Sequence, residues 1–244
     1  MKTPLEEKIS ENKRKDLIFR LIKSGSPKQY LLFFKKYHEA DIADTLEKLP
    51  AEDRQQFFLQ VNPEISAEIL EEMELEQQIE IISKFKVDVA AKFIEEMEPD
   101  DAADLLEELQ ETNEEQAEEI INALPHKEQQ DIRTLLSYPE DSAGALMTPN
   151  FLSLPEDLTI QEALESIKNQ SPPESELSFY IFIINKQKKL LGYTTMRDIL
   201  MAKPNEKTKI IRNDYPIMIH THDDQEEVAK QFQKYDMSVL PVVD

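Results

Sequence analysis

The chain contains no cysteine, only three glycines and only four histidines in 244 residues. Without cysteine there are no disulfide bonds, thiolate metal ligands or cysteine nucleophiles, and a reducing compartment is expected. Three glycines provide no glycine-rich phosphate-binding loop. None of the histidines (His38, His126, His220 and His222) lies in a metal-binding or catalytic-triad motif. We therefore expect that the protein is not an enzyme.

Basic residues and long apolar runs are also scarce. Twenty-eight Lys and Arg stand against 50 Asp and Glu, which gives a formal net charge of −22. Nucleic acid and anionic lipid require basic surfaces, so neither is an expected partner, whereas cations are attracted. The longest strongly apolar run, residues 180–184, is far shorter than the roughly 20 residues that span a bilayer. The first residues are charged and unlike a signal peptide, so we expect the chain as given to be soluble.

The first half of the sequence repeats its apolar residues every twelve positions. Two large residues stand three positions apart in each repeat, and a small residue often stands three positions before them. The three series are Leu46, Phe58, Leu70, Ile82, Ile94 and Leu106; Leu49, Val61, Met73, Phe85, Met97 and Leu109; and Ala43, Ala67, Ala91 and Ala103. Spacings of three place each set on one helical face, and twelve residues accommodate about two helical turns with a tight connection.

Helices of two turns must bury their apolar face against neighbours, so residues 40–125 are predicted to form a compact α-superhelix. Longer amphipathic helices are expected before it, over residues 6–23 and 27–37. Pro50, Pro63 and Pro99 are expected near helix starts, where the missing N–H group costs nothing.

The charge on this array is uneven, because no Lys or Arg occurs between Phe93 and His126 while 13 carboxylates do. Asp100 and Asp104 are four residues apart and share a helix face. Two carboxylates about 4 Å apart repel by roughly 4 kcal/mol at an effective dielectric constant near 20. A solvated face explains single carboxylates, and the helix dipole explains acids at a helix start. For the whole cluster we predict a face that binds a hard dication, Mg²⁺ or Ca²⁺.

After Met147 the pattern becomes an alternation of strands and helices that occurs twice. Strands are expected at 151–154, 179–184 and 190–194, with helices at 159–168 and 196–201. The order then restarts with a strand at 217–220, a helix at 225–235 and a strand at 239–243. The sequence Tyr180–Asn185 aligns with Val239–Asp244, and the second copy stops there. The second half is therefore predicted to be a tandem repeat of one α/β module with an incomplete second copy.

The motifs of this half are those of CBS domains. The residues Asp157-x-Thr159-x-x-Glu162-Ala163 and Gly192-x-x-Thr195-x-x-Asp198 carry the likeness. Together with the acidic superhelix and the joint Asp141-Ser-Ala-Gly-x-Leu-Met-Thr148, the chain from about residue 28 resembles the cytosolic part of MgtE-type magnesium channels. The implied fold is an all-α superhelix of short helices followed by α/β tandem CBS (Bateman) domains, the second CBS domain being incomplete. The implied boundaries are 1–137 for the helical domain, 138–148 for the joint, and 149–208 and 209–244 for the CBS domains.

In this family, Mg²⁺ bridges acidic surfaces of the helical and CBS domains and favours the closed pore. The resemblance implies metal ligands on both domains: Asp100, Asp104 and Glu68 on the first, and Asp224, Glu226 and Asp236 on the second. It also implies a homodimer formed through the CBS domains, the channel's own transmembrane domain as a partner, and a location at the cytoplasmic face of the membrane. Simple structural roles are the alternatives for two of these acids, with Asp224 as a helix N-cap and Asp236 as a turn residue.

CBS pairs also bind adenine nucleotides in related proteins. By this resemblance Tyr180 is expected to contact adenine, and Thr195, Arg197 and Asp198 to contact ribose and phosphate of ATP. The structural alternatives are sheet packing for Tyr180 and a helix cap for Asp198. At the level of the whole protein, the rival hypotheses to a Mg²⁺ sensor are a nucleotide sensor and a metal-independent protein-binding scaffold.

Overall fold

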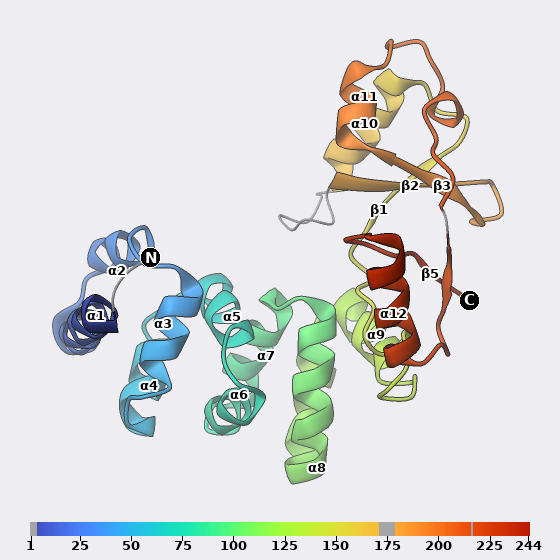
Figure 1. Cartoon of the computed structure of the whole chain (residues 1–244). Helices are drawn as coiled ribbons and strands as arrows, with labels where there is room; N and C mark the ends of the chain where they lie inside the picture. Colours follow the sequence, from blue (N-terminus) through green and yellow to red (C-terminus); the bar gives the residue numbers. More distant parts are fainter. Residues whose placement is uncertain (1–3, 171–178, 216) are drawn as a thin grey trace. The chain divides into compact units, whose positions relative to one another are not determined.

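The computed structural model describes residues 4–170, 179–215 and 217–244, with side chains from Asn12 onward except that of Pro27. The chain forms two compact units, Met1–Ile132 and Arg133–Asp244. Helices make up the first unit, and two small sheets with their helices make up the second (Figure 1).

The first unit begins with α1 (Pro4–Ser24) and α2 (Pro27–Phe34), and a series of short helices follows. These are α3 (Glu39–Leu46), α4 (Ala51–Phe58), α5 (Pro63–Glu71), α6 (Leu75–Ile82), α7 (Val87–Glu96) and α8 (Pro99–Ala123), followed by α9 (His126–Leu135). From α3 to α8 each helix starts twelve residues after the one before. Pro50 is the N-cap residue of α4, and Pro63 and Pro99 begin α5 and α8. The predicted superhelix of short helices is confirmed.

The repeat exists because every helix needs its neighbours. Helices pack on the second helix along the chain: α3 on α5, α4 on α6, α5 on α7 and α6 on α8. Each residue of the three repeated apolar series is at most 8 % exposed. The repeated positions therefore form the continuous core between the stacked helices, as predicted.

A kink at Asn113 divides α8, because its φ of −155° and ψ of 76° are not helical. The side-chain oxygen of Asn113 accepts a hydrogen bond from the Gln116 N–H group (3.3 Å) and so caps the second part of α8. The kink lies close to residue 111, where the next repeat would begin. The twelve-residue period thus persists inside what is drawn as one long helix.

The second unit contains the two copies of the α/β module. In the first copy, β1 (Leu152–Pro155) pairs in parallel with β2 (Tyr180–Ile184), which pairs antiparallel with β3 (Leu190–Thr195). Helices α10 (Ile160–Asn169) and α11 (Met196–Met201) follow β1 and β3. The core of this copy includes Leu154, Ile160, Ile181, Ile183 and Ile199.

In the second copy, β4 (Ile219–His220) pairs in parallel with β5 (Val242–Val243), and α12 (Gln225–Tyr235) lies between them in sequence. These strands are shorter than the expected 217–220 and 239–243. Pro241 has no N–H group to donate, but its carbonyl oxygen accepts a hydrogen bond from the Ile219 N–H group (3.0 Å) at the start of the paired segment. The predicted order of strands and helices is nevertheless confirmed.

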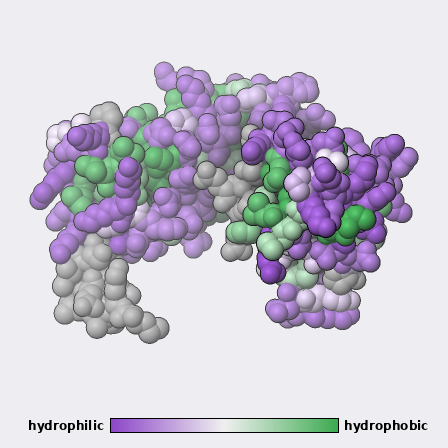
Figure 2. All heavy atoms as spheres, turned by 90° about the horizontal axis from the view of Figure 1, so that it is seen from above, coloured by the Kyte–Doolittle hydropathy of each residue, from purple (hydrophilic) through white to green (hydrophobic). Residues whose placement is uncertain are grey.

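No helix within the described ranges combines the length and the apolar content needed to cross a membrane. Hydrophilic side chains predominate on the face seen in Figure 2, in keeping with the charge composition.

Candidate functional site

Carboxylates gather where the end of α5 meets the start of α8. Glu68 and Glu71 lie in the last turn of α5, while Glu98 is the N-cap residue of α8 and Asp100 and Asp101 lie in its first turn. The Glu98 N–H group donates a hydrogen bond to Glu71 Oε1 (2.7 Å). This bond fastens the two helices together and brings acids 27 residues apart in sequence into one cluster.

Burial and mutual repulsion shift two of these carboxyls strongly. Burial, followed by the charges of Asp101, Glu98 and Glu68, raises the pKa of Glu71 to about 7, although the hydrogen bond from Glu98 opposes the shift. Desolvation of its carboxyl by the surrounding protein, although the residue is exposed overall, followed by the charges of Asp100, Asp104 and Glu98, raises the pKa of Asp101 to about 6. In both carboxyls, burial and neighbouring negative charge disfavour the charged form.

Three of the residues expected to bind metal therefore belong to one electrostatic cluster. Asp100 is half-buried, whereas Asp104 and Glu68 are exposed. Asp100 and Asp104 act on Asp101, and Glu68 acts on Glu71. The sequence analysis did not identify Glu71 as a member of this cluster. The twelve-residue repeat offers a signal for it, because Glu71 lies two repeats after Glu47. Glu47 makes the equivalent contact: its Oε1 accepts a hydrogen bond from the N–H group of Glu74, the N-cap residue of α6 (3.0 Å).

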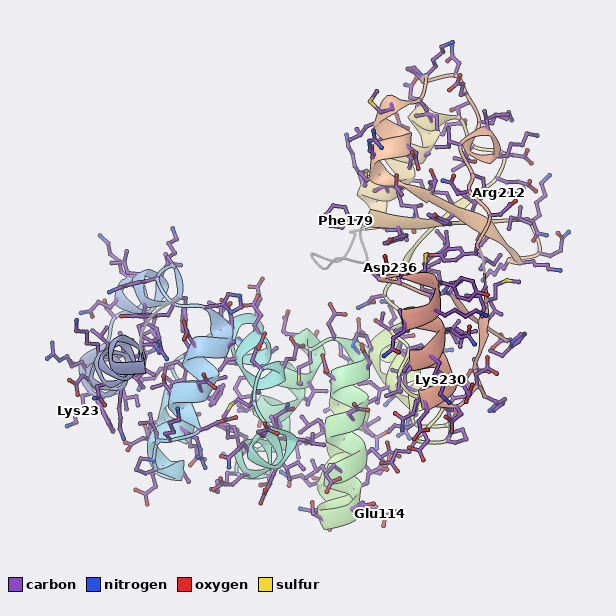
Figure 3. The ribbon with its side chains drawn as sticks, viewed as in Figure 1. Lys23, Glu114, Phe179, Arg212, Lys230 and Asp236 are labelled. Atoms are coloured by element: carbon purple, nitrogen blue, oxygen red, sulfur yellow. The ribbon has the colours of Figure 1, made fainter. Side chains whose placement is uncertain are left out.

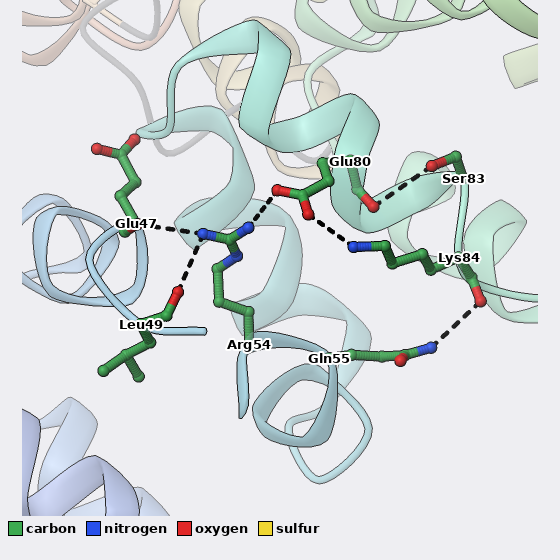
Figure 4. A network of polar contacts seen from close by, with 7 residues as sticks. All are labelled: Glu47, Leu49, Arg54, Gln55, Glu80, Ser83 and Lys84. Atoms are coloured by element: carbon green, nitrogen blue, oxygen red, sulfur yellow. Dashed lines mark hydrogen bonds and ion pairs between the residues drawn. The ribbon is translucent and has the colours of Figure 1, made fainter. Parts of the chain in front are cut away.

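Glu80, a carboxylate of the same unit with basic partners, has a pKa shifted in the opposite direction. Glu80 on α6 accepts hydrogen bonds from Arg54 and from Lys84 Nζ, the latter at 2.6 Å (Figure 4). The hydrogen bond from Lys84, with the charges of Arg54 and Lys84, lowers the pKa of Glu80. Arg54 also donates to the carbonyl groups of Glu47 and Leu49 (3.1 and 3.2 Å), so this pair holds α4 against its neighbours. Basic side chains of the same unit thus favour the charged form of Glu80, whereas burial and neighbouring carboxylates disfavour the charged forms of Glu71 and Asp101.

The cluster fits a cation that keeps part of its hydration shell. Within the part of the chain that the structure describes, no three Asp, Glu or His side chains come close enough to enclose a metal ion by themselves. Mg²⁺ binds carboxylates while retaining several water molecules, so an open acidic face suits it. The cluster occupies the start of α8, whereas Glu114 lies just after the kink that divides this helix (Figure 3).

The acids expected on the second CBS domain fall into two places on α12. Asp224 is the N-cap residue, and its Oδ1 accepts a hydrogen bond from the Glu226 N–H group (2.9 Å). Asp236 ends the same helix in the left-handed conformation, with φ of 51°. Eleven helical residues separate the two ends by roughly 16 Å, so Asp236 cannot share one ion with Asp224 and Glu226. All three are exposed.

The four residues expected to contact nucleotide line one cleft of the second unit. Tyr180 on β2 lies opposite Thr195 at the end of β3. Thr195 Oγ1 donates to Asp198 Oδ2 (2.7 Å), and the Asp198 N–H group donates back to Thr195 Oγ1 (3.1 Å), which caps α11. The helix-cap role considered for Asp198 is therefore present, and exposed Arg197 supplies positive charge to the cleft.

Other residues of this cleft escaped sequence reasoning. Besides the four expected residues its lining includes Phe179, Tyr193, Asn213 and Ser238. Asn213 donates to Asp198 Oδ2 (3.4 Å), and the Tyr180 and Tyr193 rings lie 5.8 Å apart. Ser238 comes from the second copy of the module, so the cleft is shared by both copies. An aromatic wall beside a cationic side chain is suited to a flat, anionic ligand.

Comparisons with known proteins agree with this architecture. Residues 37–141 match the MgtE intracellular N domain, and residues 143–205 match the CBS domain. The chain carries an MgtE N domain followed by a CBS domain. The predicted resemblance to the cytosolic region of MgtE-type proteins is thereby confirmed.

Individual MgtE relatives extend the match over nearly the whole chain. The magnesium transporter MgtE of Thermus thermophilus is 32 % identical over 98 % of this chain and 52 % of its own length. That of Bacillus subtilis is 30 % identical over 51 % of this chain and 27 % of its own length. The chain thus spans about half of the first of these relatives and about a quarter of the second. Both are named magnesium transporters.

Two solved structures share the MgtE-type fold with a TM-score of 0.85 and 26 % identity. One is the soluble part of a magnesium transporter, matched over 96 % of this chain and 91 % of that one. The other is the cytosolic domain of the Mg²⁺ channel MgtE in complex with ATP, matched over 94 % of this chain and 92 % of that one.

The joint of this MgtE-type chain is fastened to the segment that carries Asp224. Ala143 and Gly144 donate their N–H groups to the carbonyl oxygens of Asp223 (2.8 Å) and Thr221 (2.7 Å), and Asp141 O accepts from the Gln225 N–H group (2.9 Å). A side chain at position 144 would lie 2.6 Å from the Tyr138 ring and 2.8 Å from Thr221 O. The glycine of the joint is therefore required by this close approach.

Proposed function

We propose that this chain is the Mg²⁺-sensing cytosolic region of an MgtE-like magnesium channel or transporter. The observation that carries the proposal is the carboxylate cluster at the start of α8, where burial and neighbouring carboxylates raise the pKa values of Glu71 and Asp101, on a helical domain of this family. In the proposed assembly the chain works at the cytoplasmic face of the membrane, as a homodimer through its CBS domains, and acts on the protein's own transmembrane domain.

Electrostatic repulsion supplies the mechanism. When Mg²⁺ is scarce, the carboxylates of Glu68, Asp100 and Asp104 and those of the second CBS domain at Asp224, Glu226 and Asp236 repel one another. A dication held between such surfaces replaces repulsion with attraction and favours the closed pore. Binding shifts this equilibrium only by its differential affinity for the two states, so several weak sites acting together make the response steep.

The test is small-angle scattering of residues 1–244 as Mg²⁺ is added at constant ionic strength. The wild type is expected to become more compact. Asp100→Asn/Asp104→Asn should shift the midpoint to at least roughly tenfold higher Mg²⁺, about 1.4 kcal/mol. The matched control is Glu114→Gln/Glu115→Gln, which removes the same charge from exposed positions elsewhere on α8. The absence of a Mg²⁺-specific response, or an equal shift in both variants, would contradict the proposal and favour a metal-independent scaffold.

We further propose that the cleft at Tyr180 binds an adenine nucleotide. The support is the convergence of Tyr180, Thr195, Arg197 and Asp198 in one cleft and the ATP complex of a similar structure. Isothermal titration with ATP is expected to detect binding that Arg197→Ala weakens and that Lys186→Ala, at an exposed turn, leaves unchanged. Equal affinities for the two variants would argue against this cleft.

A further inference from the structure

The net charge of the chain conceals two regions of opposite sign. Residues 1–37 contain ten Lys and Arg but only four Asp and Glu, a balance of +6. Since the whole chain carries −22, the remaining residues carry −28. The basic region coincides with α1 and α2, the two helices that precede the twelve-residue repeat.

One side of α2 combines basic residues with exposed leucines. Lys28, Leu31, Leu32 and Lys35 follow the spacing of three and four that places residues on one helical face. Leu31 is 51 % exposed and Leu32 is 59 % exposed, and both lysines are exposed.

A groove between α1 and α2 continues this surface. Its lining includes the basic residues Arg20 and Lys36, together with Leu32 and the buried Phe33. Lys23, also exposed, projects from α1 at the same end of the array (Figure 3). Arg14 does not contribute, because it is buried and forms an ion pair with Asp41 at 3.0 Å.

We propose that the face formed by Arg20, Lys23, Lys28, Leu31, Leu32, Lys35 and Lys36 docks on an anionic membrane surface. Basic residues interleaved with exposed apolar ones on a short helix are typical of interfacial segments, because the lysines meet lipid phosphates while the leucines enter the acyl boundary. The acidic surface of a second copy of the chain would complement this basic and apolar face less well than an anionic membrane does. No large hydrophobic residue is exposed between residues 60 and 145 of the described chain, so that surface offers charge without an apolar counterpart.

The acidity of the rest of the chain does not prevent this docking. Within the first unit, α1 and α2 stand at one end of the helical array and α8 at the other (Figure 1). Packed helices are about 8–10 Å apart, so the carboxylates of α8 are separated from α2 by on the order of 20–30 Å. The Debye length at physiological salt is about 8 Å, which screens most of that repulsion. The expectation that lipid is not a partner followed from the net charge alone, which averages the two regions.

The test is co-sedimentation of residues 1–244 with lipid vesicles in the absence of Mg²⁺, so that its result is independent of the proposed Mg²⁺ response. Binding is expected with vesicles of phosphatidylcholine mixed with phosphatidylglycerol and not with pure phosphatidylcholine. Each basic residue near such a surface contributes about 1 kcal/mol, so Lys28→Glu/Lys35→Glu should reduce binding roughly thirtyfold or more. Leu31→Ser/Leu32→Ser should also reduce it, with unchanged helix content by circular dichroism.

The matched control is Lys186→Glu/Lys189→Glu, which makes the same change in net charge at exposed positions of the second unit and should bind like the wild type. No binding to the mixed vesicles, or an equal loss in the control, would overturn the proposal. Self-association that Lys28→Glu/Lys35→Glu abolishes, with no vesicle binding, would also overturn it and would identify a second copy as the occupant.

Discussion

Glu71 and Glu47 occupy equivalent places in the repeat, 24 residues apart. Each accepts a hydrogen bond from the N-cap residue of a later helix, Glu98 for Glu71 and Glu74 for Glu47. Glu71, however, is half-buried among other carboxylates, and burial together with their charges raises its pKa to about 7. At the residue scale, therefore, burial and neighbouring carboxylates outweigh the hydrogen bond in setting the pKa of Glu71.

This difference predicts how stability depends on pH. Because the pKa of Glu71 is higher in the folded state than its usual 4.5, the folded state binds more protons, and its stability falls as pH rises between about 4.5 and about 7. Glu71→Gln removes the charge and keeps an oxygen acceptor for the Glu98 N–H group. We expect Glu71→Gln to be more stable than wild type by roughly 1–2 kcal/mol at about pH 8 and nearly equal to it at about pH 5.

Urea unfolding at the two pH values measures this effect, and Glu47→Gln is the control. Glu47 lies outside the acidic stretch, so Glu47→Gln should show no such pH-dependent gain. A gain of the same size for Glu71→Gln at both pH values would show that the charge of Glu71 is not its cause.

At the scale of elements, the helical array follows from the sequence because the helices are too short to be stable alone. Each must present its apolar stripe to its neighbours, and so the spacing of Leu46, Phe58 and Leu70 records the packing directly. The contact between Glu71 and the start of α8 leaves no local pattern, since its partners are 27 residues apart. The same holds for Ser238 in the cleft at Tyr180, which the second copy of the module contributes.

In the joint, residues 138–148, the structure explains why a glycine stands at position 144. Gly144 approaches the Tyr138 ring and Thr221 O so closely that an added Cβ has no room. Gly144→Ala is expected to destabilise the second unit by about 1–3 kcal/mol, because overpacking displaces the Thr221–Gln225 segment that the joint holds. Thermal unfolding measures the loss. Leu146→Ala, at an exposed position of the same joint, should cost much less. Equal losses for the two variants would mean that the close approach is not the cause.

At the scale of the whole molecule, charge is segregated along the chain. The first 37 residues carry +6 and the remainder −28. Repulsion among like charges destabilises a compact state and weakens when salt screens it. The positive helices and the negative stretch of α8 lie in the same compact unit at opposite ends, so they relieve one another little at physiological salt. The net negative charge of the remainder therefore attracts counterions from the surrounding solution.

Salt is consequently expected to stabilise this protein, and more so at neutral than at acidic pH. Raising NaCl from about 0.01 M to about 0.1 M shortens the Debye length from about 30 Å to about 10 Å and should raise the Tm by a few degrees at about pH 8. At about pH 5 the increase should be smaller, since Glu71 and Asp101, with pKa values of about 7 and about 6, are then largely protonated. Differential scanning calorimetry measures the Tm at both pH values.

Replacing NaCl with MgCl₂ at equal ionic strength separates screening from binding. A further rise in Tm that Asp100→Asn/Asp104→Asn removes would come from ions held at the start of α8. Identical Tm values in the two salts would mean that the acidic surface is only screened.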